Sequence, residues 1–239
     1  MLSEDITLLK QWIKEAKRIV FFGGAGVSTA SDIPDFRGVN GLTHYQNIPV
    51  ETLLSHDYIM SHTFDFYRFY QKNMIHKNAK PNIIHRYLAL LEKKNPNLCI
   101  ITQNIDGLHQ KAGSTHVLEL HGTIELNRCM NCQKLYKLDE LNFSDTIPRC
   151  ECRGIIKPEV VLYGEMLDNN VLNQSIEAIR KADLLLICGT SLQVYPAAGL
   201  IHEYKGNRLV LINHTKTSFD YYANLVINTS LEEVFSQLD

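Results

Sequence analysis

The chain has 239 residues, of which 45% are apolar, and its 24 basic and 26 acidic side chains leave a formal net charge of -2. This is the composition of a globular protein, without the broad positive field that grips nucleic acid or an anionic membrane. The N-terminus lacks the cationic start and apolar core of a signal peptide, and no apolar run is long enough to span a bilayer. We therefore expect a cytoplasmic protein that binds neither nucleic acid nor membrane.

Helical and strand-like segments alternate along most of the chain. Ser3 is a suitable N-cap for an amphipathic helix that leads into an apolar strand at 19–22. Further apolar runs predict strands at 98–102, 117–120, 184–188, 209–212 and 225–227, with helices near 81–93, 170–181 and 196–204. Because these runs are continuously apolar rather than alternating, they predict an α/β fold with a parallel sheet covered by helices on both faces.

The first predicted strand runs directly into a glycine-rich turn. Gly24 and Gly26 leave bare backbone whose N–H groups can approach a pyrophosphate, and Arg37 could close such a site. The usual dinucleotide fingerprint is incomplete, because Thr29 stands at its third glycine position and no acidic residue follows about twenty positions after Gly24. A plain strand-to-helix turn is therefore an open alternative.

Polar residues follow the other predicted strands. The carboxyl ends of parallel strands meet at one edge of a sheet, where Gly24, Thr102, His121, Gly189 and Asn213 would emerge. The amide and carboxylate groups of the stretch 102–109 could hydrogen-bond an amide such as the carboxamide of nicotinamide. A lone histidine is more often structural than functional, so His121 by itself decides nothing.

Two insertions interrupt the α/β pattern, at about 39–80 and 125–156, and we expect them to form a smaller lobe. The first is rich in aromatic residues. The second holds Cys129, Cys132, Cys150 and Cys152, close to the spacing of a four-thiolate zinc ribbon, although the second pair has one intervening residue instead of the usual two. This pattern predicts one structural Zn²⁺ per chain, and incidental or redox-active thiols are the alternative. Cys99 and Cys188 lie apart in apolar runs and are expected in the core.

Taken in order, the motifs resemble those of the sirtuin family of NAD-dependent protein lysine deacylases, over nearly the full length. The matching stretches are 24–28, 33–37, 102–106, 120–122, the four cysteines, 157–165 and 189–191. The resemblance implies a Rossmann-like NAD-binding domain formed by 1–38, 81–124 and 157–239. It also implies a small domain that combines a helical module at 39–80 with a zinc-ribbon module at 125–156.

The same resemblance assigns roles to individual residues. It implies that His121 is the catalytic base and that Asn104 supports the ribose side of the reaction. The implied NAD contacts are Gly24, Ala25, Gly26, Thr29, Asp35, Phe36, Arg37, Gln103, Ile105, Asp106, His121, Gly189, Thr190, Ser191 and Asn213. The substrate peptide would lie as an added strand between two segments, Val160, Val161, Leu162, Tyr163 and Gly164 on one side and Gln193 and Val194 on the other.

The implied activity is deacetylation of lysine in a protein or peptide, with NAD as co-substrate and O-acyl-ADP-ribose as product. Sirtuins that prefer acidic acyl groups carry an arginine three places after a tyrosine, whereas Tyr70 is followed by Asn73, so we expect a neutral acyl group. Asp32, where a glycine is common, and the short spacing of Cys150 and Cys152 are two further departures from the family pattern. Alternatives are ADP-ribosyl transfer to protein, a non-catalytic NAD-binding module and an NAD dehydrogenase.

Overall fold

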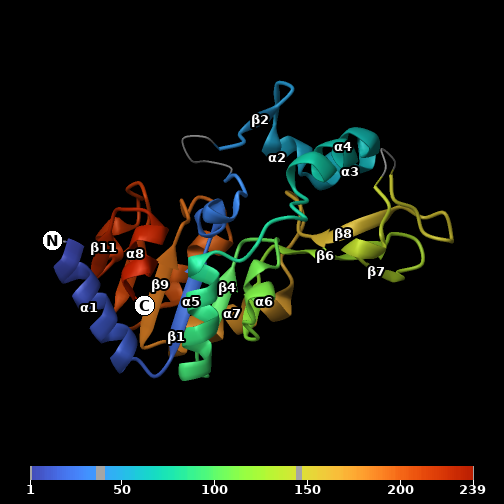
Figure 1. Ribbon diagram of the computed structural model, residues 1–239. Coiled ribbons are helices and arrows are strands. Elements are labelled where there is room, and N and C mark those ends of the chain that lie inside the picture. Colours follow the sequence, from blue (N-terminus) through green and yellow to red (C-terminus); the bar gives the residue numbers. More distant parts are fainter. Residues whose placement is uncertain (1, 36–40, 144–146, 239) are drawn as a thin grey trace.

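The computed structural model describes residues 2–35, 41–143 and 147–238. Figure 1 shows a larger α/β part with a smaller part beside it. The larger part is built on a six-stranded sheet in the order β11-β10-β9-β1-β4-β5, with every neighbouring pair parallel. Its strands are β1 (Ile19–Gly23), β4 (Cys99–Thr102), β5 (Val117–Glu119), β9 (Leu184–Cys188), β10 (Leu209–Ile212) and β11 (Leu225–Ile227). The predicted parallel sheet is confirmed.

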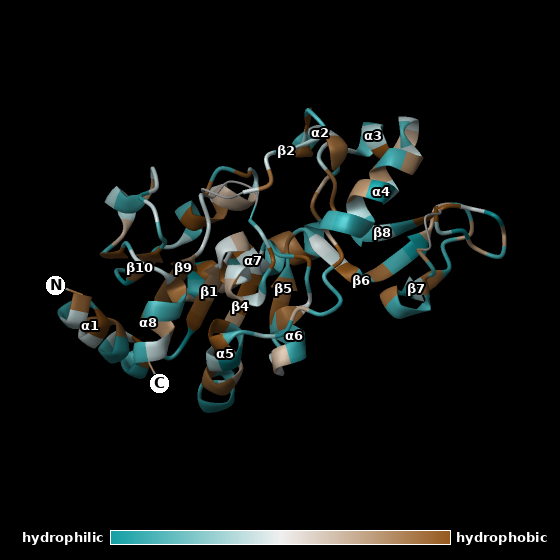
Figure 2. Cartoon of the chain, turned by 45° about the horizontal axis from the view of Figure 1, so that its top comes forward, coloured by the Kyte–Doolittle hydropathy of each residue, from teal (hydrophilic) through white to brown (hydrophobic). Residues whose placement is uncertain are grey.

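Helices cover both faces of this sheet. Successive strand residues point to opposite sides, and because these residues are nearly all apolar, both faces need to be buried. Phe21 packs on the face covered by α1 (Leu2–Glu15), α5 (Ile83–Lys94) and α8 (Leu231–Leu238), and α6 (Leu108–Ala112) packs against α5. Phe22 packs on the opposite face, under α7 (Asn169–Lys181) and η4 (Ala197–Glu203). Figure 2 shows the strands of the six-stranded sheet as mostly hydrophobic and the helices as mixed.

Local sequence explains where these elements begin and end. Asn82 caps α5 through a capping box with His85, and Asp168 caps α7 by accepting two backbone N–H groups. The helix predicted at 196–204 forms instead as a 3-10 helix, η4. Other 3-10 turns are η1 (Ala25–Val27), η2 (Thr29–Ser31), η3 (Leu138–Glu140) and η5 (Asp220–Tyr222).

The smaller part joins short helices to a second sheet. The hairpin β2 (His44–Tyr45) and β3 (Ile48–Pro49) leads into α2 (Val50–Leu53), α3 (His56–Ser61) and α4 (Thr63–Asn73). The sheet is antiparallel in the order β7-β6-β8, with β6 (Gly122–Cys129), β7 (Leu135–Lys137) and β8 (Ile156–Val160). The aromatic side chains Phe66, Tyr67, Phe69 and Tyr70 of α4 are 0–2% exposed and pack against β6 and β8.

Within the described ranges, no helix is both long enough and apolar enough to cross a membrane. Cys99 and Cys188 are buried in the sheet, as expected from their apolar surroundings.

Candidate active site and metal centre

The candidate site lies where the direction of the chain across the sheet reverses. β1 and β9 are neighbours, but the chain continues from β1 to β4 on one side and from β9 to β10 on the other. In open parallel sheets such a switch point is where ligands bind, beyond the carboxyl ends of the strands. The loops after β1, β4, β5, β9 and β10 all begin at this edge and carry the polar residues singled out in the sequence.

Two glycine loops meet at the switch point with no room for side chains. A Cβ on Gly24 would lie 2.6 Å from Thr190 Cβ, and one on Gly26 would lie 2.8 Å from Gly189 Cα. Gly26 N donates to Gly189 O at 2.8 Å, and Gly189 has a φ of +59°, which favours glycine. The glycines therefore serve close backbone contact between the loops after β1 and β9.

A buried serine connects the glycine loop to the polar loop after β4. Ser28, 1% exposed, donates through Oγ to Asp106 Oδ2 at 2.7 Å and accepts from Asn104 Nδ2 at 3.0 Å. Asp106 Oδ1 also accepts from Leu108 N at 2.9 Å. These bonds fix the carboxylate and the amide side by side. Ser28 lies in one of the motifs that match the family, but it was not among the predicted site residues. A hydroxyl two residues after the second glycine, Gly26, was the sequence feature that could have identified it.

His121 follows β5 with a defined tautomer. Its Nδ1 lies 2.9 Å from Gln103 O, and a carbonyl oxygen can only accept, so Nδ1 carries the proton and Nε2 keeps a free lone pair. Burial lowers the pKa of His121 below its usual range, while the bond to the Gln103 carbonyl acts in the opposite direction. The ring is therefore neutral near pH 7 and can act as a base through Nε2.

The remaining predicted nucleotide residues that the structure describes lie in the chain segments that follow β1, β4, β9 and β10. Gln103 Nε2 donates to Thr190 Oγ1 at 3.1 Å, which connects the loops after β4 and β9. Asn213 Nδ2 donates to Thr215 O at 2.8 Å. Ala25 and Ser191 are half-buried. Three others are held by hydrogen bonds: Thr29 Oγ1 donates to Gly26 O, Ile105 O accepts from Ile124 N, and Asp35 O accepts from Leu42 N. Phe36 and Arg37 lie outside the described residues. Asp32 has a φ of +61°, a conformation that aspartate tolerates better than most residues.

The predicted peptide segments reach the same edge from two sides. Val161 N donates to His121 O at 2.9 Å, which places the end of β8 beside the histidine. Val160 ends β8, Leu162 is buried, Tyr163 is exposed, and Gly164 has a φ of +88°. On the other side Gln193 is exposed and Val194 is half-buried. The main chain of Tyr163 is already paired, because its N donates to Leu54 O and its O accepts from His56 N.

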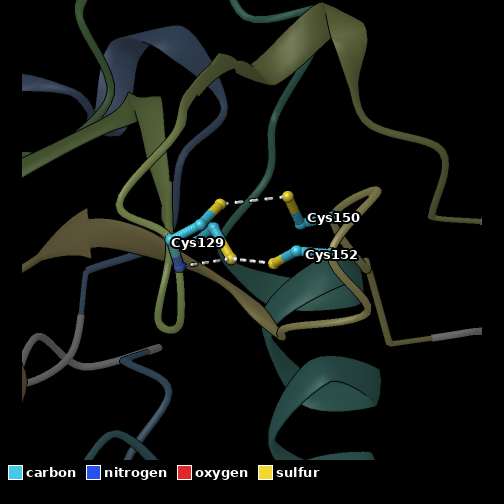
Figure 3. Close-up of side chains that lie close together, drawn as sticks. Cys129, Cys150 and Cys152 are labelled. Carbon is cyan, nitrogen blue, oxygen red and sulfur yellow. Dashed lines mark hydrogen bonds between the residues drawn. The ribbon is translucent and has the colours of Figure 1, made fainter.

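The four cysteines of the second insertion converge on one point. Their Sγ atoms all lie within 4.8 Å of one another, with Cys129 and Cys152 at 3.4 Å and Cys132 and Cys150 at 3.5 Å. Figure 3 shows the side chains of Cys129, Cys150 and Cys152 pointing toward one another. Four Zn–S bonds of about 2.3 Å in a tetrahedron require sulfurs about 3.8 Å apart. The cluster fits a structural zinc ion despite the short spacing of its second pair.

Neighbouring groups suit this cluster to a metal. Tyr136 Oη donates to Cys150 Sγ at 3.0 Å, and Asn131 Nδ2 donates to Cys152 Sγ at 3.6 Å. The backbone N–H of Gly154, helped by the other thiols, lowers the pKa of Cys152 to about 6, which favours its thiolate. At Cys132 the backbone N–H of Lys134 also lowers the pKa, but hydrogen bonds with the other three thiols outweigh it and raise this pKa to about 12. A Cβ on Gly154 would lie 2.7 Å from Cys129 Sγ, so only glycine leaves space for the sulfurs here.

Comparison with known proteins identifies the family of this chain. The Sir2 family profile matches residues 24–196. An NAD-dependent protein deacetylase of Clostridium acetobutylicum is 52% identical over 239 residues, covering 98% of this chain and 98% of the relative. A solved Sir2 structure with a p53 peptide and NAD+ has a TM-score of 0.87 at 37% identity. A second structure, of a Sir2 variant with a deacetylated p53 peptide and 3′-O-acetyl ADP ribose, has a TM-score of 0.88, also at 37% identity. Both cover 98% of this chain and 96% of the solved chain. The chain therefore belongs to the Sir2 family.

Proposed function

We propose that this protein is an NAD-dependent protein lysine deacetylase that transfers the acetyl group to ADP-ribose and releases nicotinamide. The observation that carries the proposal is the neutral His121, with Nδ1 bonded to the Gln103 carbonyl and Nε2 available as a base, at the edge that also holds Asn104 and Asp106. The Clostridium relative is named as an NAD-dependent protein deacetylase, and a related Sir2 structure holds a deacetylated peptide with an acetyl ADP ribose.

The pyrophosphate of NAD is assigned to the two glycine loops, because their close contact brings the main chains after β1 and β9 together at the switch point, where ligands bind in open parallel sheets. Ala25, Thr29 and Ser191 border this position, and Asn213 and Thr190 lie toward the adenosine side. Asp106 accepts the nicotinamide amide, for which Ile105 forms an apolar wall, while Gln103 and Asn104 hold the adjacent ribose. Asp35, Phe36 and Arg37 are proposed as further contacts of NAD.

The chemistry follows from the placement of these groups. The acyl oxygen of the modified lysine forms a bond to the ribose C1′ while the bond from C1′ to nicotinamide breaks and its electron pair leaves with the ring. His121 Nε2 then accepts the proton of a ribose hydroxyl, whose oxygen attacks the acyl carbon. The bond from the acyl carbon to the lysine nitrogen then breaks, and the proton on His121 Nε2 passes to that nitrogen, which frees lysine. Water adds to the acyl carbon and loses a proton, and O-acetyl-ADP-ribose is formed. Holding a weak nucleophile against C1′ in a shielded cleft supplies much of the rate enhancement.

Acylated lysine in a protein or peptide is the proposed partner. The peptide lies between residues 160–164 and the segment of Gln193 and Val194, and main-chain pairing there tolerates varied sequences. Because the main chain of Tyr163 is already paired with residues 54 and 56, the peptide uses its neighbours. At the position where sirtuins that prefer acidic acyl groups carry an arginine, this chain has Asn73, whose Nδ2 donates to Phe69 O. Asparagine carries no charge to pair with an acidic acyl group, so a neutral acyl group is favoured.

The zinc site and the division of the chain complete the proposal. Cys129, Cys132, Cys150 and Cys152 would hold zinc with no open coordination position, so the metal supplies structural stability to the small insertion. We propose the domain limits inferred from the sequence, with 39–80 and 125–156 forming the small domain, and a cytoplasmic location.

The test is a His121→Gln variant assayed with acetylated peptide and NAD. Because glutamine cannot accept the hydroxyl proton, we expect deacetylation to fall by about 100-fold or more, the usual range for loss of a general base. His116→Gln is a matched control, since His116 Nδ1 lies 3.0 Å from Leu98 O at the opposite end of β5. Full NAD-dependent turnover by a folded His121→Gln protein would remove His121 as the base.

A further inference from the structure

The glycine loop is held by Asn82, a buried residue at the start of α5. Asn82 is 6% exposed, and its Nδ2 donates to Val27 O at 2.8 Å and to Ser31 Oγ at 3.0 Å. Val27 and Ser31 belong to the two consecutive 3-10 turns η1 and η2 that follow the glycines. Gly26 of the same loop contacts Gly189, and Asn82 adds a second set of contacts through Val27 and Ser31.

Every polar atom of the Asn82 side chain is used, and the pattern fixes how the amide is turned. Oδ1 accepts from Ile84 N at 2.9 Å and His85 N at 3.4 Å, and the two donors of Nδ2 go to the loop. Turning the amide over would place Oδ1 against the Val27 carbonyl and Nδ2 against two N–H groups. Asn82 therefore combines two roles, as the N-cap of α5 and as a clamp on the glycine loop.

The clamp acts one peptide unit away from the reactive groups. Asn82 holds the carbonyl of the peptide bond that joins Val27 to Ser28. Ser28 in turn bonds both Asn104 and Asp106 through its Oγ. A shift of this peptide would move the serine hydroxyl and, with it, the amide and carboxylate that face the nicotinamide riboside.

We infer that Asn82 is a positioning residue for NAD, which keeps the glycine loop and Ser28 in the geometry that binds the co-substrate without touching it. The inference rests on the proposed NAD-dependent deacetylation. It predicts a selective effect, because residues 160–164 and the Gln193–Val194 segment have no contact with this clamp among the hydrogen bonds of the described residues.

The test is Asn82→Asp, which separates the two roles of this side chain. Aspartate caps a helix about as well as asparagine, so the start of α5 is kept, but a carboxylate cannot donate to Val27 O or Ser31 Oγ. We expect the KM for NAD to rise about ten-fold, equivalent to about 1.4 kcal/mol, while the KM for acetylated peptide stays within about two-fold. Ser31→Ala, which removes one of the two bonds, should raise the KM for NAD by about three-fold.

Asn95→Asp is the matched control. Asn95 lies at the other end of α5, and its Nδ2 likewise donates to a backbone carbonyl, that of Ala16, at 3.1 Å. This variant should leave both KM values within about two-fold of the parent. If Asn82→Asp does not fold, Ser31→Ala decides the question by the same split between the two substrates.

The outcomes separate this inference from the proposed function. A parent protein that does not deacetylate with NAD contradicts the proposed function itself. If the parent is active and Asn82→Asp keeps the parental KM for NAD, or raises both KM values equally, Asn82 is only a helix cap and the inference is wrong.

Discussion

Two histidines buried against each other should make the fold sensitive to acid. His85 on α5 and His109 on α6 are 0% and 1% exposed, with ring centroids 4.7 Å apart, and His109 also contacts Phe21. Burial lowers the pKa of His85 to about 4 and that of His109 to about 3, from an ordinary 6.5. Asp106 acts against the shift of His85, while Arg86 adds to it.

The sign and size follow from proton linkage. Below pH 6.5 each of these histidines binds a proton in the unfolded chain but stays neutral in the folded protein. Their contribution to the free energy of unfolding is therefore fully present above about pH 7 and is lost as the pH falls toward 4. At pH 5 each histidine accounts for about 2 kcal/mol, or about 4 kcal/mol for the pair. Because small proteins are stable by about 5–15 kcal/mol, this loss is a large part of the total.

The assay is urea unfolding between pH 7.5 and pH 5, compared for the parent and His109→Leu. Among the described residues neither ring nitrogen of His109 has a hydrogen-bond partner, so leucine removes a buried polar group without orphaning another. We expect His109→Leu to be at least as stable as the parent at pH 7.5 and to lose about half as much free energy at pH 5. His214→Leu, at an exposed position, is the matched control and should follow the parental curve.

The reasoning is refuted if the parent and His109→Leu lose the same free energy of unfolding between these pH values. The curves would then be parallel, and the acid sensitivity would belong to other groups.

Three further predictions concern the loops, the metal and the acyl group. Gly26→Ala should weaken NAD binding and lower the free energy of unfolding by about 1–3 kcal/mol, since the new Cβ would lie 2.8 Å from Gly189 Cα. Thermal unfolding and the KM for NAD test this prediction, and unchanged values of both would contradict it. Tyr136→Phe should lose zinc to a colorimetric chelator about ten-fold faster or more, because Cys150 loses its hydroxyl donor, and an unchanged release rate would show that the hydrogen bond is dispensable. Acetyl peptide should exceed succinyl peptide of the same sequence by about ten-fold or more in kcat/KM, since burying an unpaired carboxylate is costly; comparable values would contradict the preference for a neutral group.

Sequence alone was sufficient for most of the sheet. The strands are continuous apolar runs, a signal that depends only on burial of both faces, and the observed strands differ from the predicted ones by a residue at some ends, as at Cys99 and Glu119. The segment from 196 to 204 was harder to predict, because an apolar helical pattern does not distinguish an α-helix from the 3-10 helix that packing imposes here. The cysteine pattern also predicted a metal site that the converging sulfurs fit.

The supporting contacts of the candidate site could not be predicted from local patterns. Ser28 meets Asp106 across 78 positions of sequence, and Asn82 meets Val27 across 55. The first pair follows from the pairing of β1 with β4, and the second from the place of the start of α5 beside the glycine loop, and no local spacing encodes either. The tautomer of His121 likewise depends on the Gln103 carbonyl, a main-chain group that every sequence carries.

The central claim is that cleavage of NAD is coupled to acyl transfer. Its most direct test is the product balance of the purified protein with an acetylated peptide and NAD, measured by mass spectrometry. The account predicts nicotinamide, deacetylated peptide and O-acetyl-ADP-ribose in equal amounts. Nicotinamide accompanied by ADP-ribose on a protein side chain, or deacetylated peptide formed with free acetate and intact NAD, would contradict it.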